Sequence, residues 1–194
     1  EPFAYSIGCN RVREWGLARA RGTAFAAGAE GAGLEPQSAS NPAEVRGRDI
    51  LRLAAGDAGV AAGSVDGALR FWAGARGSAL GAGRQAPPTR WQGHEGRVTG
   101  LAFCGAALLS CSLDGRVRRW MGGVGGGSWE AYAEADLGAR LHALSVCAQT
   151  SLACCGTSEG DVVALDARTL AEVGRVSVGA RVGALVSGAA WLVA

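Results

Sequence analysis

The sequence predicts an all-β protein built from a repeated unit of four short strands. Three observations support this prediction. A hairpin motif of the Asp-Gly type recurs along the chain, a pair of apolar residues precedes each copy at a nearly constant spacing, and the apolar runs are only four to six residues long. Short apolar runs that are bounded by Gly favour strands over helices.

The hairpin motif ends on Trp in its best copies. Trp72 and Trp120 close two copies 48 residues apart, whereas Leu165 occupies the Trp position of a third copy and Trp15 closes a fourth. Asp-Gly between apolar segments is a strong signal for a tight turn between antiparallel strands. The copies are SVDGALRFW (64–72), SLDGRVRRW (112–120), TSEGDVVALD (157–166) and SIGCNRVREW (6–15).

The other strands of the unit recur in phase with this hairpin. Apolar residues spaced i, i+3 begin at Ile50, Val98, Leu141 and Val182, in steps of 48, 43 and 41 residues. A second apolar strand follows each pair, and a more polar segment follows the hairpin as an outer strand. The second strands are GVAAG (59–63), ALLSC (107–111), SLACC (151–155) and AAWLVA (189–194), and two outer strands are TRWQG (89–93) and EVGRV (172–176).

A repeat of just over 40 residues with four strands is typical of a β-propeller blade. The segment GHEGRVTGLAFCGAALLSCSLDGRVRRW (93–120) begins with Gly-His and ends with Trp, and it resembles the WD40 family. The resemblance covers residues 1–15, about 45–72 and 91–194, and is strongest at 93–120. We therefore expect an incomplete WD40-type β-propeller of about four blades that forms an open arc.

A single domain should span residues 1–194. Its expected parts are a partial blade at 1–15, a blade at about 20–72 with a loop at 29–43, blades at 89–120 and 129–166, and a partial blade at 172–194. The chain begins without Met and without the basic and apolar segments of a signal peptide, which favours a fragment whose remaining blades are missing from this chain.

The resemblance also assigns roles to polar residues. In WD40 blades a buried hydrogen-bonded network joins His, Ser or Thr, Asp and Trp, which here are His94, Ser110, Asp114 and Trp120. A buried carboxylate needs such donors around it. A Ser-His-Asp hydrolase triad is the rival interpretation, but a nucleophile needs an exposed site. Partial copies of the network remain at other blades, at Asp66, Trp72 and Trp15.

Composition excludes several classes of function. The net charge of +2 is too small to indicate nucleic acid or an anionic membrane as a partner. A chain without Lys cannot form a P-loop, and six Cys without a CxxC pair match no zinc site, so we expect neither a cofactor nor a metal. Cysteines within apolar runs are expected to be reduced and buried, which favours the cytoplasm or nucleus.

The resemblance implies a non-enzymatic scaffold for protein partners, such as an adaptor or a substrate-recognition subunit of a larger complex. Arg97, Arg140 and Arg181 precede the first strand of successive blades, and Arg48 and Asp49 precede the blade before them. We expect these residues to form a basic arc that binds acidic or phosphorylated segments. Two alternatives remain, namely a propeller-hosted enzyme that uses channel-lining residues and an incomplete gene product without independent function.

Overall fold

The structure is a computed structural model. It describes complete residues at 50–73, 88–122, 128–147 and 149–186, and the backbone alone at residue 187 and in four further strands, at 3–8, 11–16, 36–39 and 192–193. The described residues are arranged in strands and turns, without a helix. The fold is therefore all-β, as the sequence predicts.

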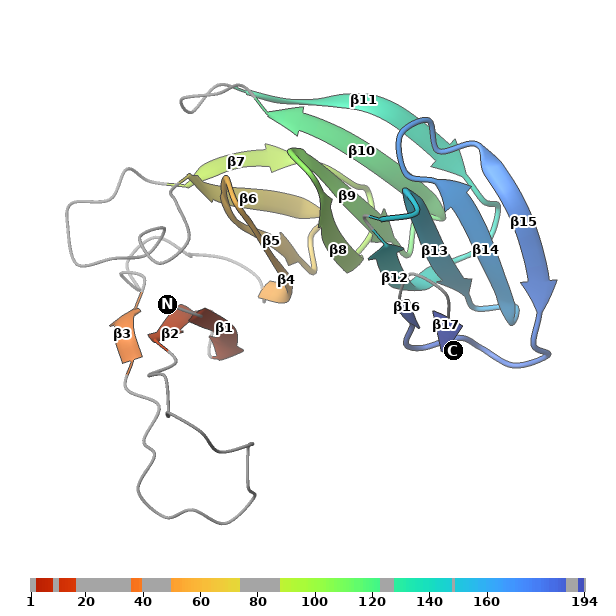
Figure 1. Ribbon diagram of the computed structural model, residues 1–194, viewed down its shortest axis with the longest axis horizontal. Helices are drawn as coiled ribbons and strands as arrows, with labels where there is room; N and C mark the ends of the chain where they lie inside the picture. Colours follow the sequence, from red (N-terminus) through yellow and green to blue (C-terminus); the bar gives the residue numbers. More distant parts are fainter. Residues whose placement is uncertain are drawn as a thin grey trace, which may run out of the picture.

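Three complete four-stranded antiparallel sheets form most of the molecule (Figure 1). We call them sheets 1, 2 and 3. Each follows chain order from an inner strand to an outer strand, because each strand is joined to the next by a short turn or a longer outer loop. Sheet 1 contains β4 (Ile50–Gly56), β5 (Gly59–Ser64), β6 (Ala68–Ala73) and β7 (Thr89–Gln92); sheet 2 contains β8 (Val98–Cys104), β9 (Ala107–Ser112), β10 (Arg116–Gly122) and β11 (Trp129–Asp136); sheet 3 contains β12 (Leu141–Cys147), β13 (Leu152–Thr157), β14 (Asp161–Asp166) and β15 (Glu172–Ser177).

Two partial sheets stand at the ends of the row. The N-terminal sheet contains β1 (Phe3–Gly8), β2 (Arg11–Gly16) and β3 (Pro36–Ala39), and the C-terminal sheet contains β16 (Val186–Ser187) and β17 (Leu192–Val193). Figure 1 shows the five sheets in sequence along an open arc, with the partial sheets at its two ends and β7, β11 and β15 on the outside. The architecture is thus that of an incomplete propeller.

The positions of the outer strands differ from two of our expectations. The loop expected at 29–43 contains β3, which pairs with β2 through Arg13 and Ala39. Pro36 is tolerated because β3 is an edge strand. The Pro- and Ser-rich composition therefore did not exclude a strand here, although it favoured a loop. The rest of 29–43 lies outside the described residues. We expected the blades at 89–120 and 129–166 to begin with their outer strands. In the structure the outer strands β7, β11 and β15 pair with the third strand that precedes them in the chain, so each sheet is offset from the expected unit by one strand.

The three complete sheets share irregularities at equivalent positions. The pairing of the first two strands shifts register between Ile50 and Arg52, between Val98 and Gly100, and between Leu141 and Ala143. A bulge of this kind adds one residue and bends the strand. The bulged residues, which are Leu51, Thr99 and His142, are therefore structural equivalents, and the register of each sheet can be compared residue by residue.

The second strands are buried between neighbouring sheets, whereas the outer strand β15 of sheet 3 is exposed. Every residue of β5 and of β9 is buried, which is the pattern of a strand covered on two sides. One apolar cluster joins sheet 1 to sheet 2, a second joins sheet 2 to sheet 3, and a third joins sheet 3 to the segment before β16. Because the core lies between the sheets, each sheet depends on the one beside it.

Glycine in the second strand permits this close stacking at two equivalent positions. A Cβ atom on Gly63 would lie 2.5 Å from Cγ1 of Val98, which opens the next sheet, and a Cβ atom on Gly156 would lie 2.5 Å from Cγ1 of Val182. Both distances are shorter than real Cβ contacts, so a larger residue would push the neighbouring inner strand away.

We expect Gly63→Ala to lower the free energy of unfolding by about 1–3 kcal/mol, the usual cost of overfilling a tight core. Urea unfolding followed by tryptophan fluorescence measures this change. Gly174→Ala is the matched control, because a Cβ atom there meets nothing within 4 Å. Equal stability of the two variants would contradict the proposed role of Gly63 in sheet stacking.

Candidate functional site

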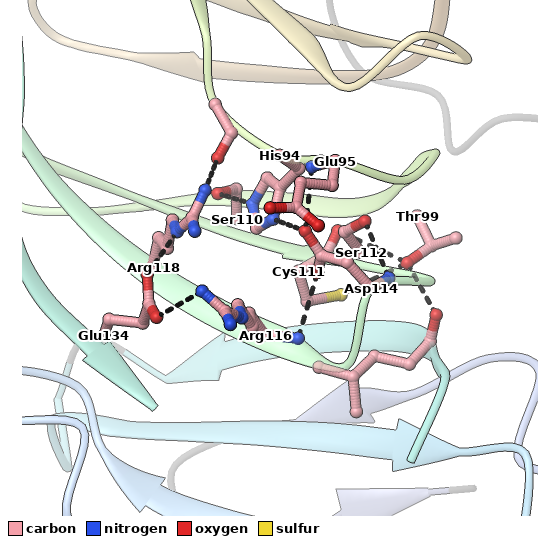
Figure 2. Close-up of polar contacts among 12 residues, drawn as sticks. His94, Glu95, Thr99, Ser110, Cys111, Ser112, Asp114, Arg116, Arg118 and Glu134 are labelled. Carbon is pink, nitrogen blue, oxygen red and sulfur yellow. Dashed lines mark hydrogen bonds and ion pairs between the residues drawn. The ribbon is translucent and has the colours of Figure 1, made fainter. Parts of the chain in front are cut away.

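The four residues that the sequence assigns to a polar network come together in sheet 2. Figure 2 shows three of them, His94, Ser110 and Asp114. His94 Nδ1 lies 2.9 Å from Asp114 Oδ2, and His94 Nε2 lies 2.7 Å from Ser110 Oγ. Trp120 Nε1 donates to Ser110 Oγ at 2.8 Å. His94, Ser110 and Trp120 are buried, and the Asp114 side chain is 8% exposed. The network thereby links the segment before β8, the strand β9, the hairpin turn after it and the strand β10.

The donors and acceptors of this network fit a neutral imidazole. Trp120 can only donate to Ser110, whose own hydroxyl proton is then free to go to His94 Nε2. His94 Nδ1–H in turn donates to the Asp114 carboxylate, which can only accept when ionised. Burial lowers the pKa of His94 and outweighs the Asp114 charge, which acts in the opposite direction. The neutral ring therefore satisfies every member of the network.

Asp114 also organises the turn on which it stands. Its carboxylate accepts the backbone N–H of Arg116 at 3.0 Å and that of Glu95 at 3.1 Å. Burial alone would raise the pKa of Asp114, but His94 and these hydrogen bonds together hold the pKa below its usual value. Gly115 follows with a φ of 86°, a conformation that favours glycine, which explains the Asp-Gly pair.

A second layer of charges surrounds the network on the outer side. Arg118 donates to the carbonyl of Gly93, the residue before His94, and also pairs with Glu134 of β11. Arg116 donates to Glu134 at 2.9 Å. Half-exposed ion pairs contribute little individually. Their effect here is to attach the outer strand and the segment before His94 to the third strand.

The connectivity of Asp114, His94 and Ser110 is also that of a hydrolase triad, so access decides between the two interpretations. Ser110 has no exposed surface, and its Oγ already accepts the indole N–H of Trp120. A substrate carbonyl cannot reach a hydroxyl that is enclosed in this way. The geometry thus supports a structural role for these three residues.

Sheet 3 has apolar side chains at the His94, Ser110 and Trp120 positions of the network. By strand register, Cys155 stands at the Ser110 position, Val163 at the Arg118 position and Leu165 at the Trp120 position. All three are fully buried, and Leu137, at the His94 position, packs against them. Glu159, at the Asp114 position, is exposed. A partly satisfied buried network is worse than an apolar core, so these positions are expected to change together.

Sheet 1 keeps the turn Asp and the third-strand Trp of the network, but its other buried hydrogen bond joins an Arg to a Ser. Asp66 accepts the backbone N–H of Ala68 at 3.2 Å, as Asp114 does in its turn, and Trp72 is buried on the third strand. Arg70, which is 3% exposed and at the Arg118 position, donates to Ser64 Oγ at 2.9 Å. Burial lowers the pKa of Arg70. Trp15 lies on β2, and only its backbone is described.

The three arginines of the expected basic arc are exposed. The carbonyls of Arg97 and Arg140 each accept a backbone N–H from the hairpin turn of their own sheet, from Leu113 and Ser158, so the two positions are structurally equivalent. Arg181 is also exposed and precedes the buried Val182. Arg48 and Asp49 lie outside the described residues.

Burial lowers the pKa of His142, and the charges of Arg181 and Arg140 lower it further. Val182, which follows Arg181, packs in the same buried cluster as Ala143, which follows His142. Arg140 and Arg181 thus stand within a few residues of the same contact, between β12 and the segment before β16.

The cysteines described by the structure are free thiols that pack in the core. Cys154 and Cys155 are neighbours on β13 and point to opposite faces, yet both are buried, because Cys155 lies in the cluster between sheets 2 and 3 and Cys154 in the cluster between sheet 3 and the segment before β16. Burial raises the pKa of Cys111 to about 12, and that of Cys155 well above its usual value. Within the described ranges there is no cluster of metal ligands and no helix able to span a membrane.

Sequence reasoning missed the aromatic cluster between sheets 1 and 2. Trp91 of β7 stacks on Trp129 of β11 with ring centroids 5.4 Å apart and an angle of 3°, and it meets Trp120 edge-on at 5.8 Å. Phe71 packs against Trp129 at 4.8 Å. The concentration of Trp in TRWQ and SWEAY was the available signal, but the contacts depend on how two sheets stack.

Comparisons with known proteins show the fold. No protein-family profile and no curated protein sequence matches the chain. The chain is similar to a chain in the crystal structure of the Mitotic Checkpoint Complex, with a TM-score of 0.68 and 19% identity over 94% of this chain and 50% of that one. It is also similar to two computationally designed proteins. Ika4 matches with a TM-score of 0.58 and 22% identity over 73% of this chain and 81% of Ika4, and Ika8 with 0.60 and 17% over 93% and 51%.

These likenesses are at the level of architecture, because the sequence identities are low. The chain spans about half the length of the checkpoint-complex chain and of Ika8. Its likeness to both extends over nearly the whole of its own length. The row of sheets described above is therefore arranged as in part of a larger fold.

We expect Ser110→Ala to lower the free energy of unfolding by about 1–3 kcal/mol, because it leaves the Trp120 N–H and the acceptor nitrogen of His94 buried without partners. Chemical denaturation measures the loss. Ser177→Ala on the exposed outer strand is the control and should be neutral. A Ser110→Ala variant as stable as this control would show that the network contributes nothing to stability.

Stability should also depend on pH through His94. Its pKa is lower in the folded protein than the value of about 6.5 in an unfolded chain. The unfolded chain binds more protons at mildly acidic pH, so this contribution is complete above about pH 6.5 and is lost as the pH falls toward the folded-state pKa. We expect the free energy of unfolding to decrease between pH 7.5 and pH 5.5.

The variants His94→Gln and His142→Gln separate the two histidines of the chain. Denaturation of His94→Gln should show a weaker dependence on pH than the parent, even though its stability is lower overall. His142→Gln should remove a smaller part, since that ring is less buried. An unchanged slope in His94→Gln would contradict a neutral, buried imidazole.

Proposed function

We propose that this chain is a non-enzymatic protein-interaction scaffold of the WD40 type that works in the cytoplasm or nucleus. The WD40 assignment is supported by the His94, Ser110, Asp114 and Trp120 network together with the order of strands in each sheet. A scaffold role is supported by the propeller-like fold and by the enclosure of the Ser-His-Asp set. One structural neighbour belongs to a multiprotein complex, which is compatible with protein partners.

The observation that carries this proposal is the availability of the arginines at the start of the inner strands. Arg97, Arg140 and Arg181 are exposed, and none of them forms an ion pair with another described residue. Other arginines of the same sheets are neutralised within the protein; Arg116 and Arg118 pair with Glu134, and Arg175 pairs with Asp161 and Glu172. Among the described residues nothing neutralises these three arginines, which supports their use in binding a partner.

The chemistry of this surface favours an acidic or phosphorylated segment of a protein. A guanidinium group binds a carboxylate or phosphate through two parallel hydrogen bonds. Val182 and Ala143 pack in one buried cluster, which brings together the segments that carry Arg181 and Arg140 and supports their binding to one anionic segment. With a net charge of only +2, the chain offers this concentrated positive charge without a general affinity for polyanions.

Charge reversal tests the proposal. A fluorescein-labelled peptide with two phosphoserines between glutamates should bind the parent chain, and Arg97→Glu/Arg140→Glu should weaken binding at least tenfold by fluorescence anisotropy. The reason is that a charge-assisted hydrogen bond contributes about 1.5–3 kcal/mol, and about 1.4 kcal/mol corresponds to a factor of ten.

Arg168→Glu is the control, because Arg168 is exposed on the turn before β15 and outside this surface. It should bind the peptide like the parent. Binding should also weaken with added salt. The proposal is wrong if the parent does not bind the peptide, or if the Arg97/Arg140 and Arg168 variants lose affinity equally.

A further inference from the structure

The outer strand of sheet 2 contains one residue that is left out of the strand pairing. Arg119 pairs with Ala133 and Trp120 pairs with Ala131, so Tyr132 is bulged out of the ladder between β10 and β11. A bulge re-aims a side chain at the edge of a sheet. Tyr132 is 73% exposed, the highest value among the exposed large apolar side chains of the described ranges. The bulge therefore projects a tyrosine from the outer side of the arc (Figure 1).

Sheet 3 has the same bulge with a different side chain. Leu165 pairs with Glu172 and Ala164 pairs with Gly174, which leaves Val173 out of the ladder between β14 and β15. Val173 is also largely exposed, at 62%. The outward projection is thus a property of the repeated fold, whereas sheet 2 places a phenol hydroxyl at this position. Packing does not explain the tyrosine, because its side chain is not buried.

The ring of Tyr132 lies against a cation on the neighbouring strand. The guanidinium carbon of Arg119 is 5.2 Å from the centroid of the ring. This contact holds the ring by attraction between the positive charge and the aromatic face. It leaves the hydroxyl group at the far end of an exposed side chain, where an enzyme can reach it.

The charge of Arg119 has no counter-ion among the described residues. Arg116 and Arg118, on the same strand, both pair with Glu134. The Nε atom of Arg119 is buried without a described hydrogen-bond partner, which is unusual for a polar atom of a folded protein. A guanidinium group binds phosphate oxygens through charge-assisted hydrogen bonds. Arg119 is therefore placed to hold a phosphate group that is attached to Tyr132.

The segment around Tyr132 is open to an enzyme along its length. In SWEAYAEAD (128–136), Glu130, Ala131 and Glu134 are exposed together with the tyrosine. The strand β11 is the outer strand of its sheet and pairs only with β10 among the described strands. An edge strand offers its backbone to an incoming protein, and carboxylates on both sides of the tyrosine add a negative charge that a basic cleft recognises.

We propose that Tyr132 is a phosphorylation site and that Arg119 positions the phosphate on the outer side of sheet 2. A tyrosine kinase with MgATP supplies the reaction. The Tyr132 oxygen forms a bond to the γ-phosphorus of ATP, and the bond between this phosphorus and the oxygen that bridges the β- and γ-phosphates breaks. ADP leaves, and the hydroxyl proton passes to the catalytic base of the kinase.

The phosphate would give sheet 2 a fixed negative group on its outer side. Such a group creates a docking site for a protein that carries arginines. This site goes beyond the proposed function and does not depend on it, since it involves none of the residues Arg97, Arg140 and Arg181.

Phosphorylation of the folded 194-residue chain by the catalytic domain of a tyrosine kinase tests the site. With MgATP, intact-mass spectrometry should show one added phosphoryl group, and fragmentation should place it on Tyr132. The chain has only two tyrosines, so Tyr5→Phe is the matched control and should still be modified, whereas Tyr132→Phe should not. The peptide SWEAYAEAD (128–136) shows whether the kinase accepts the sequence by itself.

The product should keep the tryptophan fluorescence and circular dichroism of the folded chain. Modification of the peptide but not of the folded chain would show that the bulge does not present Tyr132, and would overturn the proposal. A phosphate on Tyr5 alone, or no reaction with either chain or peptide, would overturn it as well.

Phosphorus NMR of the phosphorylated chain tests the role of Arg119. A phosphotyrosine loses its second proton near about pH 6, and a neighbouring cation favours the doubly charged form. The phosphate should therefore titrate at a lower pH in the parent than in Arg119→Gln, and Arg119→Lys should keep part of the difference because it keeps the charge. The same titration midpoint in the parent and in Arg119→Gln would show that Arg119 does not hold the phosphate.

Discussion

The structure depends on one constraint, which is that the second strands of the sheets must be buried on both faces. Every residue of β5 and of β9 is buried, and in an antiparallel sheet this requires a neighbour on each side. Among the described residues, each apolar cluster accordingly lies between one sheet and the next segment. Glycine in the second strand, at Gly63 and Gly156, brings the next inner strand close enough to complete this burial.

Sheets 2 and 3 connect the third strand to the segment before the inner strand in two different ways. Sheet 2 ties its third strand to the segment before its inner strand with the hydrogen bonds of His94, Ser110 and Asp114. Sheet 3 makes the same connection with Leu137, Cys155 and Leu165, which need no partners. Buried polar groups cost free energy unless all of them are satisfied, so an intermediate with half of the network would be less stable than either solution. The repeat therefore conserves a shape while its chemistry changes.

Much of this fold could be predicted from the sequence, because its signals are local. The Asp-Gly pair, the Trp five residues after its Gly and the phase of the apolar pairs predicted the strands and their order, and the WD40 resemblance implied the members of the network. The strand β3 was missed because an edge strand tolerates Pro36 and lacks an apolar pattern. The stack of Trp91 on Trp129 and the burial of both Cys154 and Cys155 depend on which segments cover each face of a sheet, and no local pattern encodes that.

The functional argument rests on the same repetition. Because each repeat presents the residue before its inner strand in the same way, Arg97 and Arg140 are exposed at equivalent positions although they are distant in sequence. Arg181 is exposed directly before the segment that follows sheet 3. The stacking of sheets therefore supplies the positions on which the proposed partner surface depends.

The central claim is that the sheets are stable only through one another. Native-state hydrogen exchange, followed strand by strand with mass spectrometry, tests it most directly. The backbone amides of β5 and β9 should exchange with the same opening free energy and lose protection together in denaturant, because the cluster around Trp91, Trp120 and Trp129 is shared by sheets 1 and 2. Persistent protection of β9 after β5 has exchanged would show that each sheet is stable alone and would contradict this account.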